Sequence, residues 1–321
     1  MQAADAPSAN QRVVPRAIVL PDYCNTPDAM AVLANNDILL SVPNFTDPTS
    51  PGVLMRITPQ DEVSLFCKLP LHPQTNGVFP MGIRQAPSGD LYVADCQTLD
   101  ETPDNSRLLC VRVVDGQPGA VEVVANGLNV ANGVAIHNGF VYVTDSSMGK
   151  TEDGAEISGI YRFALDERNV QVVPGGSDPH LLATLKTECR EIPVGADGID
   201  IDEQGHVYVA NCGDHSDLSN AKAELAGMAE VFGHLAVIAD PPMLKGRRYG
   251  NMILIGSDAE LPAEGSPEAA QLARVLLGGA VPAHYKDERW ARALFDGTVP
   301  RTLDTRHDGA ADVISRRSPG G

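Results

Sequence analysis

The chain lacks the long apolar runs, the surplus of basic residues and the clustered cysteines that each mark a particular class of protein. No stretch of its 321 residues approaches the roughly 18 apolar residues of a membrane helix, so we expect no membrane span. With 42 acidic against 24 basic residues, the net charge of −18 argues against a nucleic-acid partner, which would require a basic face. The six cysteines show neither C-x-x-C spacing nor paired histidines, which favours buried free thiols over a zinc site.

The signatures of several enzyme classes are missing as well. There is no Gly-x-Ser-x-Gly elbow, no His-Glu-x-x-His motif and no Gly-x-Gly-x-x-Gly after an expected strand. The stretch Gly149-Lys150-Thr151 is not a phosphate-binding loop, because Thr144 stands where the earlier glycine of that motif belongs. A serine hydrolase or a zinc hydrolase is therefore not expected.

What the sequence does contain is one pattern repeated four times. Each copy opens with a short apolar stretch, passes through turn residues and returns in a second apolar burst with a polar end, which is typical of a β-hairpin. The openings begin at Asp28, Met81, Asn132 and Asp197, and the second bursts are residues 38–41, 91–95, 141–145 and 207–211. The openings are 53, 51 and 65 residues apart, close to the length of a four-stranded propeller blade.

The domain boundaries follow from where this repeat is legible. We expect a disordered segment over residues 1–15, a single β-propeller domain over 16–303 and a flexible tail over 304–321. After residue 212 the repeat weakens: residues 229–232 with 235–238 are interpreted as an outer strand pair, and 251–258 as another inner strand. Residues 267–277 and 286–295 are predicted to be helical, with Ser266 as N-cap and Gly278 as the stop.

The start of the chain leaves the cellular location open. Met1–Pro7 has neither the basic nor the apolar part of a signal peptide. It fits either an ordinary flexible terminus or the processed end of a periplasmic or secreted protein.

The repeat also predicts a site. If each hairpin begins with the innermost strand of a blade, the residues that open these strands converge around the central axis at one face. This places Asn132 and Asp197 at the channel mouth, with Asp28 and Met81 in the matching positions. Oxygen ligands from Asn and Asp suit a hard cation, and calcium fits better than magnesium because separate blades make a wide site.

The rim of this site is predicted at the ends of the second bursts. Asp95, Asp145 and Asn211 occupy those ends and, together with Met81, would surround a small-molecule substrate. Asp95 and Asp145 also fit ordinary residues at the end of a hairpin. Taken alone, the dipeptide Asn132-Gly133 fits a turn. Because Asp197-Gly198 occupies the same position of another repeat, we expect both dipeptides to lie at the propeller axis.

Two stretches carry a resemblance to a known family. Residues 130–135 with 141–146, and residues 196–202 with 205–210, resemble the senescence marker protein/gluconolactonase family, and more distantly paraoxonase and diisopropylfluorophosphatase. The resemblance covers about residues 28–212. It implies six four-stranded blades around an axial catalytic calcium, held by a Glu of the first blade, one or two Asn and a later Asp. The predicted fold is therefore an all-β, six-bladed propeller with a short helical insertion or tail near the C-terminus.

Carried across residue by residue, the resemblance makes Asn132 a calcium ligand and Asp197 both a ligand and the candidate catalytic carboxylate. Two departures stand out. Met81 occupies a position where the family commonly has another Asn, and the Glu is absent, with Asp28 as its nearest substitute.

Three functions are compatible with these residues. The first is a calcium-dependent lactonase that opens a cyclic ester. The second is a non-catalytic propeller that binds a partner at its rim and holds a structural calcium, which the two departures favour. The third is a phosphotriesterase that uses the same metal site.

Overall fold

The structure is a computed structural model, and its description is restricted to part of the chain. The described residues are 18–47, 49–97, 103–150, 154, 156–173, 178–187, 195–203, 205, 207–209, 216–248, 250–278 and 282–296. They fall into two compact units, one within Val19–Asn211 and the other within Cys212–Thr302. The sequence predicts one domain over 16–303, so this division differs from the prediction.

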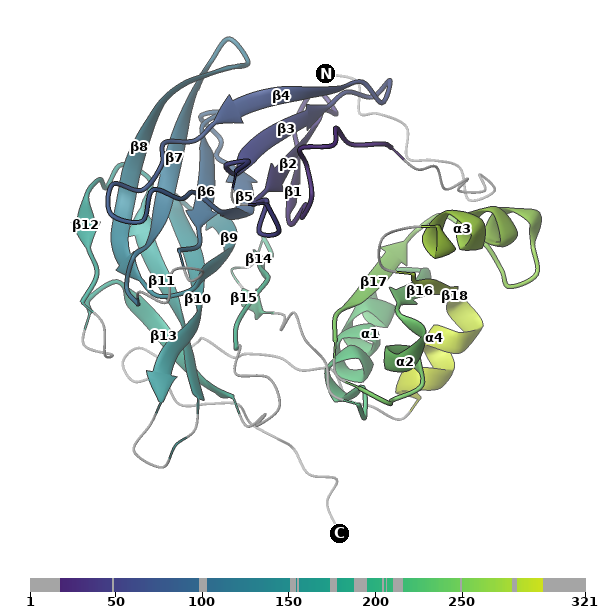
Figure 1. Cartoon of the computed structure of the whole chain (residues 1–321). Helices are drawn as coiled ribbons and strands as arrows, with labels where there is room; N and C mark the ends of the chain where they lie inside the picture. The colour runs from purple at the N-terminus through teal and green to yellow at the C-terminus, as the bar shows by residue number, and fades with distance from the viewer. Residues whose placement is uncertain are drawn as a thin grey trace. The chain divides into compact units, whose positions relative to one another are not determined.

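The first unit is a β-propeller arrangement (Figure 1). Its first blade is a four-stranded antiparallel sheet in chain order. It consists of β1 (Met30–Val32), β2 (Ile38–Val42), β3 (Val53–Ile57) and β4 (Val63–Lys68).

The second blade repeats this order and gains a fifth strand at its outer edge. It consists of β5 (Pro80–Gln85), β6 (Leu91–Asp95), β7 (Ser106–Val114) and β8 (Gln117–Leu128), with β12 (Val170–Gln171) parallel to β8.

The third blade is again four-stranded, and the fourth is a two-stranded hairpin. The third consists of β9 (Ala131–His137), β10 (Phe140–Lys150), β11 (Glu156–Ala164) and β13 (Leu181–Thr187), and the fourth of β14 (Ile199–Ile201) and β15 (Val207–Val209). The propeller prediction is confirmed, but the prediction of six blades is wrong, because the described chain builds four.

The chain beyond residue 211 leaves the propeller pattern and builds an α/β unit. Its elements are α1 (Ser219–Val231), β16 (His234–Ala239), α2 (Pro241–Leu244), β17 (Met252–Ser257), α3 (Pro267–Leu277), β18 (His284–Lys286) and α4 (Glu288–Phe295). The strands form an antiparallel sheet in the order β17-β16-β18, and side chains of α1 and α4 pack on one of its faces. No described helix has the length and apolar character that crossing a membrane requires.

The interpretation of residues 229–232 as a strand is wrong, because they belong to the end of α1 or follow it directly. The segment Ser219–Val231 is rich in Ala, Leu, Met, Glu and Lys, which are strong helix formers. The helix over 267–277 is confirmed, with the Ser266 hydroxyl accepting from the Ala269 amide and Gly278 as its C-cap. The helical content of this unit exceeds the short insertion that the sequence predicts.

Separate apolar cores lie between neighbouring blades, and strand alternation explains them. In β6, Leu91 and Val93 belong to the core shared with the first blade, whereas Tyr92 and Ala94 belong to the core shared with the third. Ala135 of β9 lies in a further core with Ile199 of the fourth blade. Because successive strand residues point to opposite faces and both faces are covered, the bursts are continuously apolar.

The cysteines in the described residues are free thiols, as expected. Cys67 and Cys110 lie inside the blade cores, Cys96 is also buried, and Cys24 is half-buried.

Glycine at the second position of the repeat lets the innermost strands approach closely. A Cβ at Gly82 would overlap the backbone of Asn132 and Gly133, and a Cβ at Gly133 would overlap the carbonyl oxygen of Asp197. Asn132 and Gly133 lie inside β9, so the alternative of a turn at this dipeptide is not realised; the turn follows at Asn138-Gly139, both with positive φ. The motif therefore marks backbone contact between blades.

Gly133→Ala is expected to destabilise the propeller by about 3 kcal/mol, because the added methyl group must displace the backbone of the fourth blade. Urea unfolding of wild type and variant measures the loss. Gly119→Ala is the matched control, since its Cβ would meet its nearest atom, the carbonyl oxygen of Arg112, at 3.4 Å. Equal effects at the two positions would contradict the close-packing argument.

A second prediction concerns the outer edge of the third blade, where His180 lies between two carboxylates. Its Nδ1 is 3.0 Å from Asp178 Oδ1 and its Nε2 is 3.1 Å from Glu167 Oε1. Burial opposes the charged ring, but the hydrogen bonds and charges of Glu167 and Asp178 outweigh it and raise the pKa of His180 above 6.5. The stabilisation is complete below pH 6.5 and is lost as the pH rises through the folded-state pKa.

His180→Gln should therefore lower the free energy of unfolding by about 1 kcal/mol in mildly acidic buffer and by less in alkaline buffer. Urea unfolding of both proteins over a pH series measures the difference. A difference that grows with rising pH would contradict the assigned ion pairs.

Candidate functional site

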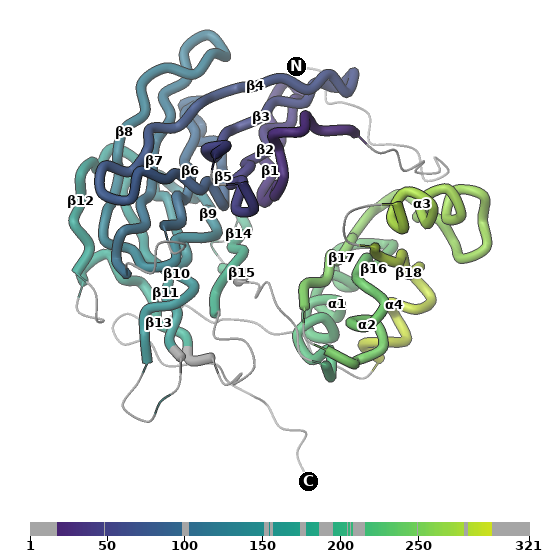
Figure 2. The backbone as a smooth tube through the Cα atoms, in the orientation of Figure 1, coloured from purple at the N-terminus to yellow at the C-terminus, as the bar shows by residue number. Residues whose placement is uncertain are grey.

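The four residues that open the repeats lie on innermost strands that follow one another in space. β1 contacts β5, β5 contacts β9, and β9 contacts β14, as the backbone tube shows (Figure 2). Asp28 precedes β1, Met81 lies in β5, Asn132 lies in β9 and Asp197 precedes β14. The structure thus places these positions at the starts of neighbouring inner strands.

Hydrogen bonds across the seam between the third and fourth blades hold Asp197 beside Asn132. The carbonyl oxygen of Asp197 accepts from the Gly133 amide at 3.0 Å and from the Thr144 hydroxyl at 2.6 Å. The Ser146 hydroxyl donates to the carbonyl oxygen of Ala196 at 2.6 Å and accepts from Asn132 Nδ2 at 3.2 Å. The backbone of residues 196–197 and the amide of Asn132 therefore share one network.

Sequence reasoning missed the two hydroxyl residues of this network. Thr144 and Ser146 lie in β10 at alternate positions and are almost fully buried. The signal was present, since Thr144 and Ser146 follow the apolar residues 141–143 in the same strand, and a buried hydroxyl requires a hydrogen-bond partner. The partners themselves, backbone carbonyls 53 and 50 residues away, could not be found from the sequence.

Asp28 and Asp197 interact electrostatically. The side chain of Asp28 keeps contact with solvent, but crowding by the surrounding chain, followed by the negative charge of Asp197, raises the pKa of Asp28 to about 6. Asp28 is thus close enough to Asp197 to feel its charge, and the backbone at Asp197 is bonded to the strand that carries the buried Asn132. Such a pair of carboxylates is stabilised by a bound cation, because the cation removes the repulsion between them.

Among the described residues, no three His, Cys, Asp or Glu side chains gather in a metal-binding cluster. The donors that Asp28, Asp197 and Asn132 could offer a cation are two carboxylates and one carboxamide. These are hard oxygen ligands, which fit calcium in type and would leave the remaining coordination positions to water or substrate. The donor set thus fits calcium in its chemistry and is smaller than a complete cage.

Asp95, predicted at the rim, is instead buried in an ion pair. Its Oδ2 accepts from Arg107 Nε at 2.7 Å, and its Oδ1 accepts from the Phe79 amide at 2.8 Å and from Gln97 Nε2 at 2.7 Å. Both members of the pair are shielded from solvent. Asp95 therefore anchors the second blade and does not face an open mouth.

Asp145, at the same position of the next repeat, is also buried. Its oxygens accept from the amides of Asn129 and Val130, each at 2.8 Å. Burial raises the pKa of Asp145 to about 6, against the lowering effect of these backbone hydrogen bonds. Asp145 thus fixes the backbone that leads into β9, and the rim position predicted for it is not realised.

Of the other two predicted rim residues, Met81 and Asn211, the structure describes one. Met81 is half-buried and packs against the core between the second and third blades. Asn211 lies outside the described residues.

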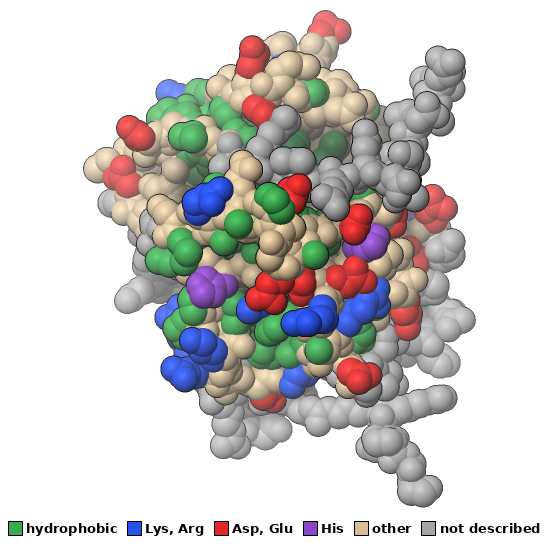
Figure 3. All heavy atoms as spheres, turned by 90° about the vertical axis from the view of Figure 1, so that its right-hand side faces the viewer, with side chains coloured by type: hydrophobic (Ala, Val, Ile, Leu, Met, Phe, Trp, Pro, Cys, Tyr) green, Lys and Arg blue, Asp and Glu red, His purple; other side chains and the backbone are tan. Residues whose placement is uncertain are grey.

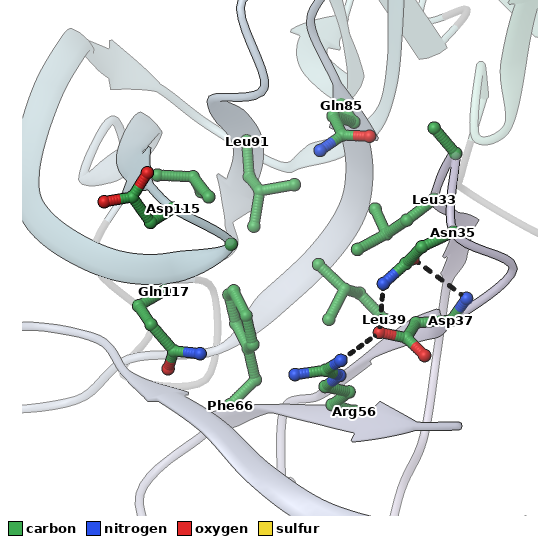
Figure 4. A pocket seen from close by; sticks show the side chains of 13 residues that line it. Leu33, Asn35, Asp37, Leu39, Arg56, Phe66, Gln85, Leu91, Asp115 and Gln117 are labelled. Atoms are coloured by element: carbon green, nitrogen blue, oxygen red, sulfur yellow. Dashed lines mark hydrogen bonds and ion pairs between the residues drawn. The ribbon is translucent and has the colours of Figure 1, made fainter.

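A separate hollow of about 330 Å³ lies at the opposite end of the first two blades (Figure 4). Asp28 precedes β1, whereas this hollow lies beside the turn that follows β1. There Asp37 forms an ion pair with Arg56 and accepts from Asn35 Nδ2 at 2.7 Å, and Leu39 and Phe66 supply apolar walls. The hollow is therefore distinct from the region of Asn132 and Asp197.

Comparison with known proteins gives partial likenesses. No protein-family model and no curated protein matches the chain. A probable spermidine synthase from Corynebacterium glutamicum is 53% identical over 37% of this chain and 37% of its own, with a TM-score of 0.28. A gluconolactonase from Xanthomonas campestris is 16% identical over 58% of this chain and 54% of its own, with a TM-score of 0.36.

A glucose dehydrogenase is 13% identical over 61% of this chain and 64% of its own, with a TM-score of 0.42. The chain thus spans less than two thirds of each of these structures. None of these likenesses assigns the chain to a family.

The buried ion pair of the second blade yields a prediction. Arg107→Met should lower the free energy of unfolding by about 4 kcal/mol, because Asp95 is left as a buried carboxylate without its cation. Arg112→Met is the control: Arg112 pairs with Asp90, but its side chain is 47% exposed, so the loss should stay within about 1 kcal/mol. Chemical unfolding of the three proteins compares them, and similar losses for both variants would contradict the structural role of Asp95.

Proposed function

We propose that the protein is a calcium-dependent hydrolase of the lactonase type, acting on a small cyclic ester. The observation that carries this proposal is the network that holds Asp197 beside Asn132, with the carboxylate of Asp28 close enough to interact with Asp197. The side chains come from separate blades of a propeller and supply only oxygen donors.

In this proposal Asn132, Asp197 and Asp28 hold the cation. A bound calcium would act as a Lewis acid toward an ester carbonyl and stabilise the developing negative charge. Ser146 orients the amide of Asn132, and Thr144 and Gly133 fix the backbone at Asp197. Asp197 is the proposed catalytic carboxylate. As a ligand it is a weak base, since a neighbouring dication lowers the pKa of a carboxylate, so it acts as a nucleophile or a movable ligand.

The acidic composition agrees with a cation site and with a neutral or weakly charged substrate. Acidic and basic side chains are mixed on the face shown in Figure 3, with hydrophobic side chains between them. The net charge of −18 of the whole chain supports a small-molecule partner over a nucleic acid.

The second candidate is a propeller that binds a partner without turnover. It is favoured by Met81, which packs into a core where a further oxygen ligand would complete the site. A phosphotriesterase would use the same ligands and differ in the shape of the pocket.

Assays of sugar lactones, aromatic lactones and a phosphotriester, with calcium and with a chelator, distinguish the three. We expect lactone hydrolysis that the chelator abolishes and that Asn132→Ala and Asp197→Asn each lower by about a hundredfold in kcat/KM. Calorimetry should show weaker calcium binding in both variants.

Asp200→Asn is the matched control, because Asp200 lies in β14 three residues from Asp197 and its side chain is 70% exposed. It should keep turnover within about twofold. Calcium binding without turnover on any ester would support the binding module. Turnover that neither Asn132→Ala nor Asp197→Asn affects would refute the proposed site.

A further inference from the structure

The sheet of the α/β unit has two edges of different character. β16 lies in the centre, and among the residues that the structure describes β17 pairs only with β16. One side of the β17 backbone therefore has no strand partner within this range. β18, at the other edge, is three residues long and contains His284 and Lys286, which is how natural edge strands avoid pairing.

β17 lacks these protective features. It is six residues long, Met-Ile-Leu-Ile-Gly-Ser, with no charged residue and no proline. Met252 and Leu254 pack with the core under α1 and α4. Ile253 and Ile255 point to the other face, and Ile253 is 60% exposed. A strand that is apolar on both faces is typical of the interior of a sheet.

We propose that β17 pairs with β17 of a second copy of this chain, antiparallel about a two-fold axis, so that one sheet runs through both copies. The charges beside the strand favour this partner. Arg247 and Arg248 precede β17, and Asp258 and Glu260 follow it; all four are exposed. An antiparallel self-pairing places the basic end of one copy beside the acidic end of the other, twice.

The alternation of side chains restricts the register. Residues directly opposite each other in an antiparallel pair point to the same face of the sheet. The two-fold axis must therefore lie midway between one residue and the same residue of the second copy. An axis at Leu254 places Ile253 opposite Ile255 of the second copy and brings Arg248 toward Glu260 of the second copy. An axis at Ile255 would instead place Ile253 opposite Ser257. The first register buries more apolar surface and matches the charges.

Arg248 also forms an ion pair with Asp240 of its own chain, and its side chain remains 58% exposed. It can therefore contact both carboxylates.

Sedimentation velocity of the full chain over a concentration series tests the proposal. Wild type should pass from monomer to dimer. Ile253→Lys, which places a charge in each of two symmetric contacts, should raise the dissociation constant about a hundredfold. Val275→Lys is the control, because Val275 is 45% exposed on α3 and lies outside the proposed interface. It should leave the dissociation constant unchanged.

Glu260→Arg keeps the test valid if Ile253→Lys fails to fold, since Glu260 is exposed and lies beyond the strand. It should raise the dissociation constant about tenfold. Hydrogen exchange locates the contact: the amides of β17 should become more protected as the protein concentration rises.

Four results would overturn the proposal. These are a wild type that stays monomeric throughout, a dimer that Ile253→Lys and Glu260→Arg both leave intact, equal effects of Ile253→Lys and Val275→Lys, and β17 amides protected at every concentration. The last result would mean that another part of the same chain covers the edge.

Discussion

The close approach of neighbouring inner strands is the constraint on which the propeller unit depends. Two blades can meet at the axis only if the backbone of one touches the backbone of the next, and a side chain at Gly82 or Gly133 would prevent this. The same contact between inner strands determines the positions of the candidate ligand residues. Asn132 directly precedes Gly133, and Gly133 faces the carbonyl oxygen of Asp197. The contact that packs the third blade against the fourth therefore also positions the candidate ligands.

The polar residues of the repeat divide into two roles according to their position. Those that open the inner strands, Asn132 and Asp197, belong to neighbouring blades and are the candidate ligands. Those at the ends of the second apolar bursts, Asp95 and Asp145, accept hydrogen bonds from backbone amides that lead into the inner strand of the same blade. The buried carboxylates thus fix the entry of each blade, which positions the residue that follows. A carboxylate in the second position therefore has a structural role inside its blade.

The sequence was informative where the repeat was strong and misleading where it faded. Paired apolar stretches with turn residues between them predicted the hairpins of the four blades, and the equivalent repeat positions of Asn132 and Asp197 predicted that they belong to neighbouring inner strands. The number of six blades came from the family resemblance. The apolar stretches at 235–238 and 251–255, which were interpreted as parts of later blades, form strands of another sheet, because a short apolar run carries no information about which sheet it joins. The rim role of Asp95 failed because its ion-pair partner, Arg107, lies on the neighbouring strand, and a partner of this kind is visible only in three dimensions.

The placing of each strand between two cores has an evolutionary consequence. Tyr92 and Val93 are adjacent in the chain, yet they contribute to different boundaries, one toward the third blade and one toward the first. Compensating substitutions for a change at Tyr92 must therefore arise in the third blade, and those for Val93 in the first. Substitutions at odd and at even positions of β6 therefore affect different blade boundaries. The two boundaries can diverge at independent rates although one strand contributes to both.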